Sequence, residues 1–166
     1  MGRKLLALLL ALALFALAGC GGKTTPGFSD ADLVLTVSGK EYHCRDNIQA
    51  VISHLGEDYQ YAEGKSCDYD GLDKTFTFAQ AEFYTNPLSE GDLVSEIYSN
   101  SDTVSTSKGI QVGATKNDVT AAYGEPAEDD GYLMIYRLSS EIGEPSLCFE
   151  MESGVVAAIF LTMEQV

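Results

Sequence analysis

Two stretches of the sequence share one pattern at an offset of 68 residues: CRDNIQAVISHLGEDY at 44–59 and VGATKNDVTAAYGEPA at 112–127. When one is placed over the other, apolar positions coincide and Gly56 falls on Gly124. A glycine at this place is typical of a helix C-terminus, where the chain needs a positive φ. The shared pattern predicts that one short amphipathic helix is duplicated within the chain.

Polar residues precede both predicted helices. Asp46 and Thr115 are the N-cap candidates, because a short side-chain oxygen there accepts a hydrogen bond from a free backbone N–H group. Pro126 prevents the second helix from continuing. Each helix is therefore expected to be only a few turns long.

Runs rich in β-branched and aromatic residues follow each predicted helix. They cover 59–71, 74–84 and 92–99 in the first copy, and 131–140, 145–152 and 155–163 in the second. We expect an α+β fold, a tandem repeat of a helix followed by a three-stranded antiparallel β-meander, joined into one antiparallel sheet with both helices on one face. Lead-in stretches at 33–40 and 103–110 would add an edge strand or a turn. The residues expected beneath the helices are Phe76, Phe78, Leu147, Phe149 and Ile159.

The first 19 residues have the form of a secretory signal. Arg3 and Lys4 precede an apolar run at 5–18 that is short for a membrane span. Leu-Ala-Gly-Cys at 17–20 resembles the lipobox of bacterial lipoproteins, which implies cleavage before Cys20 and attachment of a diacylglyceryl group, with acyl chains such as palmitate, to its thiol. The alternatives are an ordinary secretory signal with an incidental cysteine, and an uncleaved anchor.

These features divide the chain into a signal peptide at 1–19, a flexible tether at 20–32 and a single duplicated domain at 33–166. Repeat one covers about 33–104, and repeat two covers about 105–166. The mature protein is expected at the extracytoplasmic face of the cell membrane, held by its lipid. Removal of the signal leaves 8 Lys+Arg and 25 Asp+Glu, a net charge of −17, which argues against nucleic acid as a partner.

Three cysteines remain besides the lipidated one. An odd number in an exported chain indicates one disulfide with one free thiol, or no disulfide. We favour a Cys44–Cys67 disulfide, because Cys44 precedes a predicted helix and Cys67 opens a predicted strand, with Cys148 packed within a strand.

Two motifs resemble ligand-binding loops without meeting their requirements. In GIQVGATK at 109–116 the lysine is displaced from the last glycine, and Asn117 stands where a phosphate loop needs a hydroxyl. In SCDYDGLDK at 66–74 the bidentate glutamate of a calcium loop is missing. His43 and His54 have no metal-ligand spacing with the cysteines. We therefore predict no metal, no cofactor and no catalytic residue.

Tyrosine is the remaining informative residue, since the chain has nine tyrosines, seven phenylalanines and no tryptophan. Packing of half-buried strands accounts for most of them. With helices on one face only, some tyrosines must lie on the open face, where amphipathic rings suit contacts to protein or glycan. Those in or near predicted strands are Tyr59, Tyr61, Tyr69, Tyr84, Tyr98, Tyr132 and Tyr136.

The mature chain resembles a group of small lipoproteins of Gram-positive bacteria. The matching residues are Leu55-Gly56, Ser66-Cys67, Gly71-Leu72-Asp73-Lys74 and Tyr123-Gly124. More distantly, Gly113, Thr115, Val119, Gly124 and Pro126 follow a helix pattern similar to that of the β-lactamase-inhibitory protein fold and of small outer-membrane assembly lipoproteins. The resemblance implies a tandem unit with an open, often concave sheet that binds another protein.

The leading functional hypothesis is a non-catalytic module that binds an envelope protein or assists envelope assembly. The alternative is a lipoprotein that binds cell-wall glycan, a solute or a cation. An envelope enzyme ranks third, since no nucleophile pattern or distinct carboxylate pair supports it.

Overall fold

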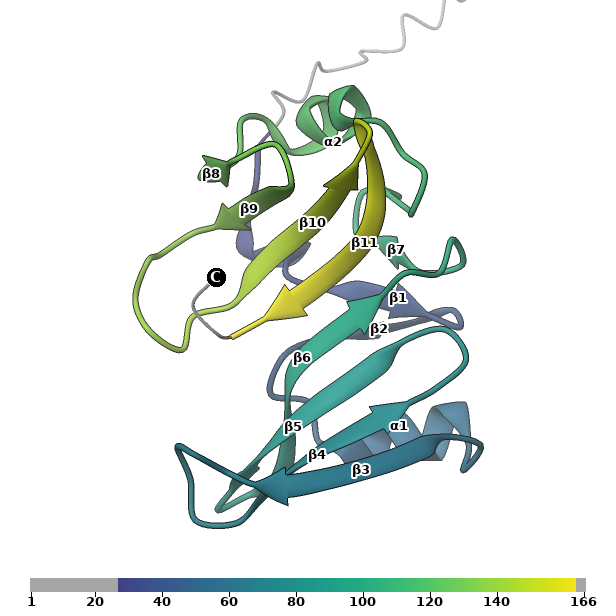
Figure 1. Cartoon of the computed structure of the whole chain (residues 1–166), viewed down its shortest axis with the longest axis vertical. Helices are drawn as coiled ribbons and strands as arrows, with labels where there is room; N and C mark the ends of the chain where they lie inside the picture. Colours follow the sequence, from purple (N-terminus) through teal and green to yellow (C-terminus); the bar gives the residue numbers. More distant parts are fainter. Residues whose placement is uncertain (1–26, 164–166) are drawn as a thin grey trace, which may run out of the picture.

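The computed structural model describes residues 27–163 and contains two antiparallel sheets and two α-helices (Figure 1). In chain order the elements are η1 (Asp30–Asp32), β1 (Leu35–Val37), β2 (Lys40–Tyr42), α1 (Ile48–Leu55), β3 (Gln60–Lys65), β4 (Leu72–Thr77), β5 (Glu82–Leu88), β6 (Gly91–Ser99), β7 (Ser105–Thr106), α2 (Lys116–Tyr123), β8 (Glu128–Asp129), β9 (Leu133–Arg137), β10 (Ser146–Glu152) and β11 (Val155–Thr162).

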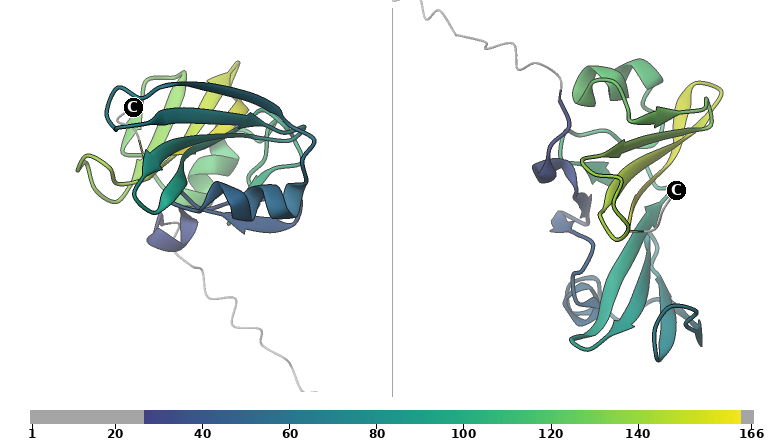
Figure 2. Two further views of the ribbon diagram at one scale, coloured as in Figure 1. Left: turned by 90° about the horizontal axis from the view of Figure 1, so that it is seen from below. Right: turned by 90° about the vertical axis from the view of Figure 1, so that its left-hand side faces the viewer.

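The large sheet has eight strands in the order β3-β4-β5-β6-β11-β10-β9-β8. Its two halves meet where β6 pairs with β11, with Ile97 opposite Leu161. Both helices lie on one side of this sheet (Figure 2) and share its hydrophobic core, to which α1 contributes Val51 and α2 contributes Val119. Neither helix covers the other side, which is therefore the open face of the sheet.

A second, three-stranded sheet has the order β2-β1-β7. The β1–β2 hairpin turns at Ser38 and Gly39, with φ of 50° and 80°. Positive φ at both central residues suits the right-handed twist of a two-residue hairpin. β7 then pairs with β1, with Thr106 opposite Leu35, so this sheet joins two distant stretches of the chain.

The expected α+β tandem repeat of helix and meander is wrong as a fold class. The structure is mostly β, with 44% strand and 14% helix, and it has two sheets where one was expected. Each helix has only eight residues, and four strands follow each helix in the large sheet rather than three. The lead-in stretches account for most of the second sheet: 33–40 supplies β1 and the turn of a hairpin that ends at Tyr42, and Ser105–Thr106 of 103–110 pairs with β1.

Local predictions fared better at the helices and in the core. Thr115 is the N-cap of α2, and its hydroxyl accepts a hydrogen bond from Asp118 N. Asn47, not Asp46, caps α1, because its side chain accepts from Gln49 N. Gly56 and Gly124 end the two helices, with φ of 90° and 81°. All the residues expected beneath the helices are buried: Phe76, Phe78, Leu147, Phe149 and Ile159.

In residues 27–163 no helix has the length and apolarity needed to cross a membrane. The predicted signal peptide at 1–19 and Cys20 lie outside the described residues. The domain boundaries and the lipid anchor therefore remain predictions.

Candidate functional site on the open face

Alternate residues of the central strands point to the open face of the large sheet. In β5 the buried Phe83 faces the core, so its neighbours Glu82 and Tyr84 face away from it. In β6 the same alternation about the buried Ile97 places Glu96 and Tyr98 on the open face.

The register between strands brings these residues side by side. Glu82 lies opposite Tyr98, and Tyr84 lies opposite Glu96. Tyr98 lies opposite Phe160 of β11, and the two ring centroids are 6.1 Å apart. These residues, together with Glu150 of β10, line a shallow hollow of about 360 Å³. We call this set the tyrosine–glutamate patch; its members are Glu82, Tyr84, Glu96, Tyr98, Glu150 and Phe160.

Both tyrosine hydroxyls of the patch donate to carboxylates. Tyr84 Oη donates to Glu82 Oε2 at 2.9 Å, and Tyr98 Oη donates to Glu150 Oε2 at 3.3 Å. Burial and the hydrogen bond to Glu82 raise the pKa of Tyr84 to about 12. Burial, followed by the charge of Glu150, raises the pKa of Tyr98 as well. Both phenols are therefore neutral near pH 7 and hold the carboxylates in place.

A small apolar cluster adjoins the patch on the same face. It consists of Ile135, Cys148 and Phe160, with Tyr98 and Leu133 packed against it. Cys148 has no exposed surface, and burial raises the pKa of its thiol to about 12. The open face therefore has a packed apolar cluster next to the carboxylates of the patch.

The chemistry of the patch suits binding. Its six residues offer three carboxylates, two phenols and one phenyl ring, and none of the six is basic. Carboxylates attract ammonium and guanidinium groups, and aromatic rings supply apolar contact area with few rotamers to order. The arrangement can therefore hold a positively charged segment against aromatic rings.

The other tyrosines considered from the sequence are dispersed. Tyr136 is buried in the core, and Tyr59 packs against the core with ring contacts to Phe76 and Phe78. The exposed ones are Tyr61, Tyr69 and Tyr132. Two of the seven, Tyr84 and Tyr98, thus belong to the patch.

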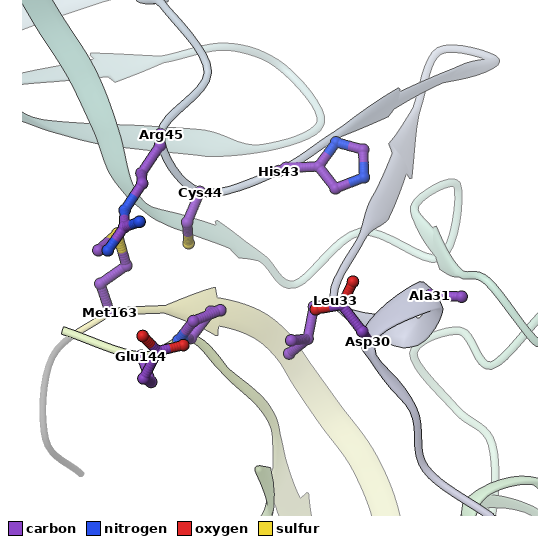
Figure 3. A pocket seen from close by; sticks show the side chains of 9 residues that line it. Asp30, Ala31, Leu33, His43, Cys44, Arg45, Glu144 and Met163 are labelled. Atoms are coloured by element: carbon purple, nitrogen blue, oxygen red, sulfur yellow. The ribbon is translucent and has the colours of Figure 1, made fainter. Parts of the chain in front are cut away.

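A second hollow, of about 340 Å³, lies beside Cys44 (Figure 3). Its lining comes from four separate stretches of chain: Asp30, Ala31, Leu33, His43, Cys44, Arg45, Glu144, Pro145 and Met163. The Cys44 side chain points between those of Met163 and Leu33 (Figure 3). Its thiol donates to the carbonyl oxygens of Ser95 at 3.4 Å and Leu161 at 3.7 Å, and burial raises its pKa to about 12.

The structure does not contain the favoured Cys44–Cys67 disulfide. Among residues 27–163, Cys44, Cys67 and Cys148 are all free. Cys44 bonds to carbonyls of β6 and β11, whereas Cys67 is exposed in the loop between β3 and β4.

The two loops that resemble ligand sites have structural roles. Lys116, which stands near the place of a phosphate-loop lysine, forms an ion pair with Asp129. In the 66–74 loop, Ser66 Oγ accepts hydrogen bonds from the N–H groups of Asp68 and Tyr69. Residues 27–163 hold no group of three or more His, Cys, Asp or Glu side chains placed to bind a metal ion.

Sequence reasoning identified the open face and its tyrosines in general terms and missed the carboxylates of the patch. Strand alternation alone would have placed Glu82 and Glu96 on the same face as the tyrosines. The position of Glu150 beside Tyr98 could be found only from the strand register, because the two residues are 52 positions apart in the chain. Comparisons with protein-family models, curated proteins and solved structures found no match.

Proposed function

We propose that this protein is a non-catalytic binding module, anchored at the extracytoplasmic face of the membrane through Cys20, that captures a positively charged partner protein. The anchor rests on the sequence of residues 1–20, and the resemblance to small lipoproteins with an open sheet points the same way. The observation that carries the binding function is the tyrosine–glutamate patch on the open face.

Three features of the patch support a protein partner. Its aromatic side chains lie on hydrogen-bonded strands, which hold them at a fixed spacing. Two of its three carboxylates, those of Glu82 and Glu150, are oriented by phenol hydroxyls, so these side chains lose little conformational freedom on binding. The chain carries a formal net charge of −15, which steers basic partners toward it and repels acidic ones.

Site-specific photo-crosslinking tests the proposal in the producing cell. A photoreactive residue replaces Glu150, which is exposed in the patch, within the full-length chain. The matched control carries the same group at Glu57, which is exposed directly after α1, the helix that covers the other face. We expect a discrete crosslinked protein with a basic surface from position 150 and none from position 57.

Charge reversal then measures the contribution of the carboxylates. Glu150→Lys should weaken binding of the crosslinked partner by about tenfold, and raised salt should weaken the wild-type complex. Glu57→Lys makes the same change in net charge away from the patch and should leave the affinity unchanged. Equal crosslinking from both positions, or equal loss from both reversals, would refute the proposal.

A second candidate function is binding of a cell-wall fragment or small solute in the hollow beside Cys44. One observation favours it: Arg45, Asp30 and Glu144 place charges of both signs around the apolar Leu33 and Met163. Calorimetric titration of the full-length protein with muropeptides and with calcium tests it. A saturable heat that Arg45→Gln abolishes would establish this function, and no heat would exclude these ligands.

A further inference from the structure

Strand β3 forms one edge of the large sheet (Figure 1). All six of its residues, Gln60–Lys65, are exposed. Within the described part of the chain β3 pairs with β4 on one side and with no strand on the other. Such an edge presents a row of backbone donors and acceptors to any strand that matches it.

The hydrogen bonds of the neighbouring hairpins define which backbone groups of β3 point outward. Ser66 N donates to Gly71 O at 3.1 Å and closes the β3–β4 hairpin. Hydrogen-bonded pairs alternate along an antiparallel ladder. Counting back in steps of two, Gly64 and Ala62 therefore bond to β4, at Asp73 and Thr75.

The hydrogen bonds of the β4–β5 hairpin independently indicate which residues of β3 bond to β4. Phe78 N donates to Ala81 O at 2.9 Å, so Phe76 and Lys74 direct their backbone groups to β5. The odd-numbered residues of β4 are left to bond to the even-numbered residues of β3. The N–H and C=O groups of Tyr61, Glu63 and Lys65 consequently point away from the sheet.

The side chains of these three residues share one face. Tyr61 packs its ring against Phe76, with centroids 5.2 Å apart, and Phe76 belongs to the core. Glu63 and Lys65 follow at two-residue spacing and therefore lie on the same side as Tyr61. The Tyr61 hydroxyl donates to the Glu63 carboxylate, which keeps that carboxylate along the strand.

We propose that β3 is a self-association edge, at which two copies of this chain pair antiparallel about a twofold axis between their Gly64 residues. In this register Glu63 of each copy lies opposite Lys65 of the other, and each of these pairs exchanges both backbone hydrogen bonds. Opposite charges meet at both ends of the contact. The two Gly64 residues form the central, closely spaced pair, where the absence of side chains leaves room for the approach.

The neighbouring symmetric registers lack this complementarity. Because only odd-numbered residues present free backbone groups, the register can shift only so that odd residues remain opposite odd residues. A centre at Glu63 opposes Glu63 to itself, and a centre at Lys65 opposes Lys65 to itself; like charges directly opposite each other are destabilising. A centre at Ala62 places Lys65 opposite Tyr59 and leaves its charge without a counter-charge. Only the centre at Gly64 pairs every charge of the strand.

An interface of one strand from each copy is small and corresponds to a weak complex. Anchoring both copies to one membrane would raise their effective concentration and favour the pair. The dimer would join two large sheets into one continuous sheet, so the two tyrosine–glutamate patches would belong to a single extended surface.

Charge exchange tests the pairing. In sedimentation equilibrium of the full-length chain in detergent, we expect a reversible monomer–dimer equilibrium. Glu63→Lys or Lys65→Glu should weaken the dimer by about tenfold, because each places two like-charge pairs at the contact. The double variant that exchanges the two residues should restore the wild-type association constant. Glu152→Lys, an exposed change of the same charge in β10, serves as the control and should have no effect.

Cysteine trapping tests the register. A Cβ atom at Gly64 would meet no other atom within 4 Å, so the strand accommodates Gly64→Cys. In a Cys67→Ser background, this variant should form a disulfide-linked dimer under mild oxidation. Ala62→Cys should not, because Ala62 lies opposite Ser66 of the other copy. A monomer at every concentration, no rescue by the charge exchange, or stronger trapping at position 62 would each overturn the proposal.

Discussion

The ammonium group of Lys108 lies 3.2 Å from the carboxylate of the buried Asp32. The same group donates to the carbonyl oxygens of Gly27 at 2.5 Å and Ala122 at 3.2 Å, and it lies 4.6 Å from the centroid of the Tyr123 ring. Lys108 thus links Gly27, at the start of the described residues, to Ala122 in the last turn of α2.

Removal of this cation should destabilise the fold. Lys108→Met keeps most of the aliphatic stem but leaves the buried carboxylate of Asp32 without its counter-charge, so the free energy of unfolding should fall by about 1–3 kcal/mol. Urea denaturation measures the loss. The control is Lys116→Met, which breaks the more exposed ion pair with Asp129 and should cost about 0–1 kcal/mol. If both variants lost the same free energy of unfolding, the burial of Asp32 would not strengthen its ion pair with Lys108, and the prediction would be wrong.

The same carboxylate should make stability depend on pH in the acid range. Burial alone would raise the pKa of Asp32, but hydrogen bonds from Ser107, Ser29 and the lysine outweigh burial and lower it. A carboxyl group with a lowered folded-state pKa contributes stability above its unfolded pKa, about 4, and loses it as the pH falls through the folded value. Unfolding free energies measured from pH 6 to pH 2 should decline, and less steeply for Asp32→Asn. Parallel profiles would contradict this assignment.

The three free cysteines should differ in reactivity. Burial raises the pKa values of Cys44 and Cys148 to about 12, so their thiols stay protonated near pH 7. Cys148 is buried, and Cys44 is partly buried beside a hollow. Cys67 is exposed. Pulse alkylation followed by peptide mass spectrometry should label Cys67 rapidly in the native protein, Cys44 much more slowly, and Cys148 only after unfolding. Because the three thiols are free, a reducing agent should leave the Tm unchanged. If Cys44 and Cys67 formed a disulfide, reduction would lower the Tm.

A buried hydroxyl connects α2 to the small sheet. Tyr123 Oη donates to Thr106 Oγ1 at 2.6 Å, and Thr106 belongs to β7. Tyr123→Phe should lower the free energy of unfolding by about 0.5–1.5 kcal/mol, the net value of one such bond. Tyr132→Phe removes a hydroxyl from a side chain that is 79% exposed and should change nothing. Thermal or urea unfolding of both variants makes the comparison.

The sequence supported predictions where neighbouring residues decide the structure. Alternation along a strand placed Phe76 and Phe78 in the core, and both are buried. Local hydrogen bonding made Thr115 a helix cap, and the structure confirms it. The cap of α1 was missed by one residue, because Asp46 accepts from His43 N and leaves the capping position to Asn47.

Predictions failed where distant pairing decides the structure. The second sheet depends on Leu35 lying opposite Thr106, a contact that no local pattern indicates. The thiols of Cys44 and Cys67 are both free in the structure, and Cys44 instead bonds to carbonyls of β6 and β11 that lie far along the chain. The tyrosine–glutamate patch likewise arises from the register of four strands. Alternation can place Glu82 and Glu96 on the open face, but only the register brings Glu150 beside the tyrosines.

If the chain is anchored through Cys20, as proposed, the placement of β1 has a mechanical consequence. Tension applied from the N-terminal side would reach the Lys108 contacts first and then β1, the central strand of the small sheet. Because β1 is bonded on one side to β2 and on the other to β7, a pull along it loads two ladders in shear. An edge strand in this position would instead peel away one hydrogen bond at a time, so the observed order makes the attachment point resistant to force.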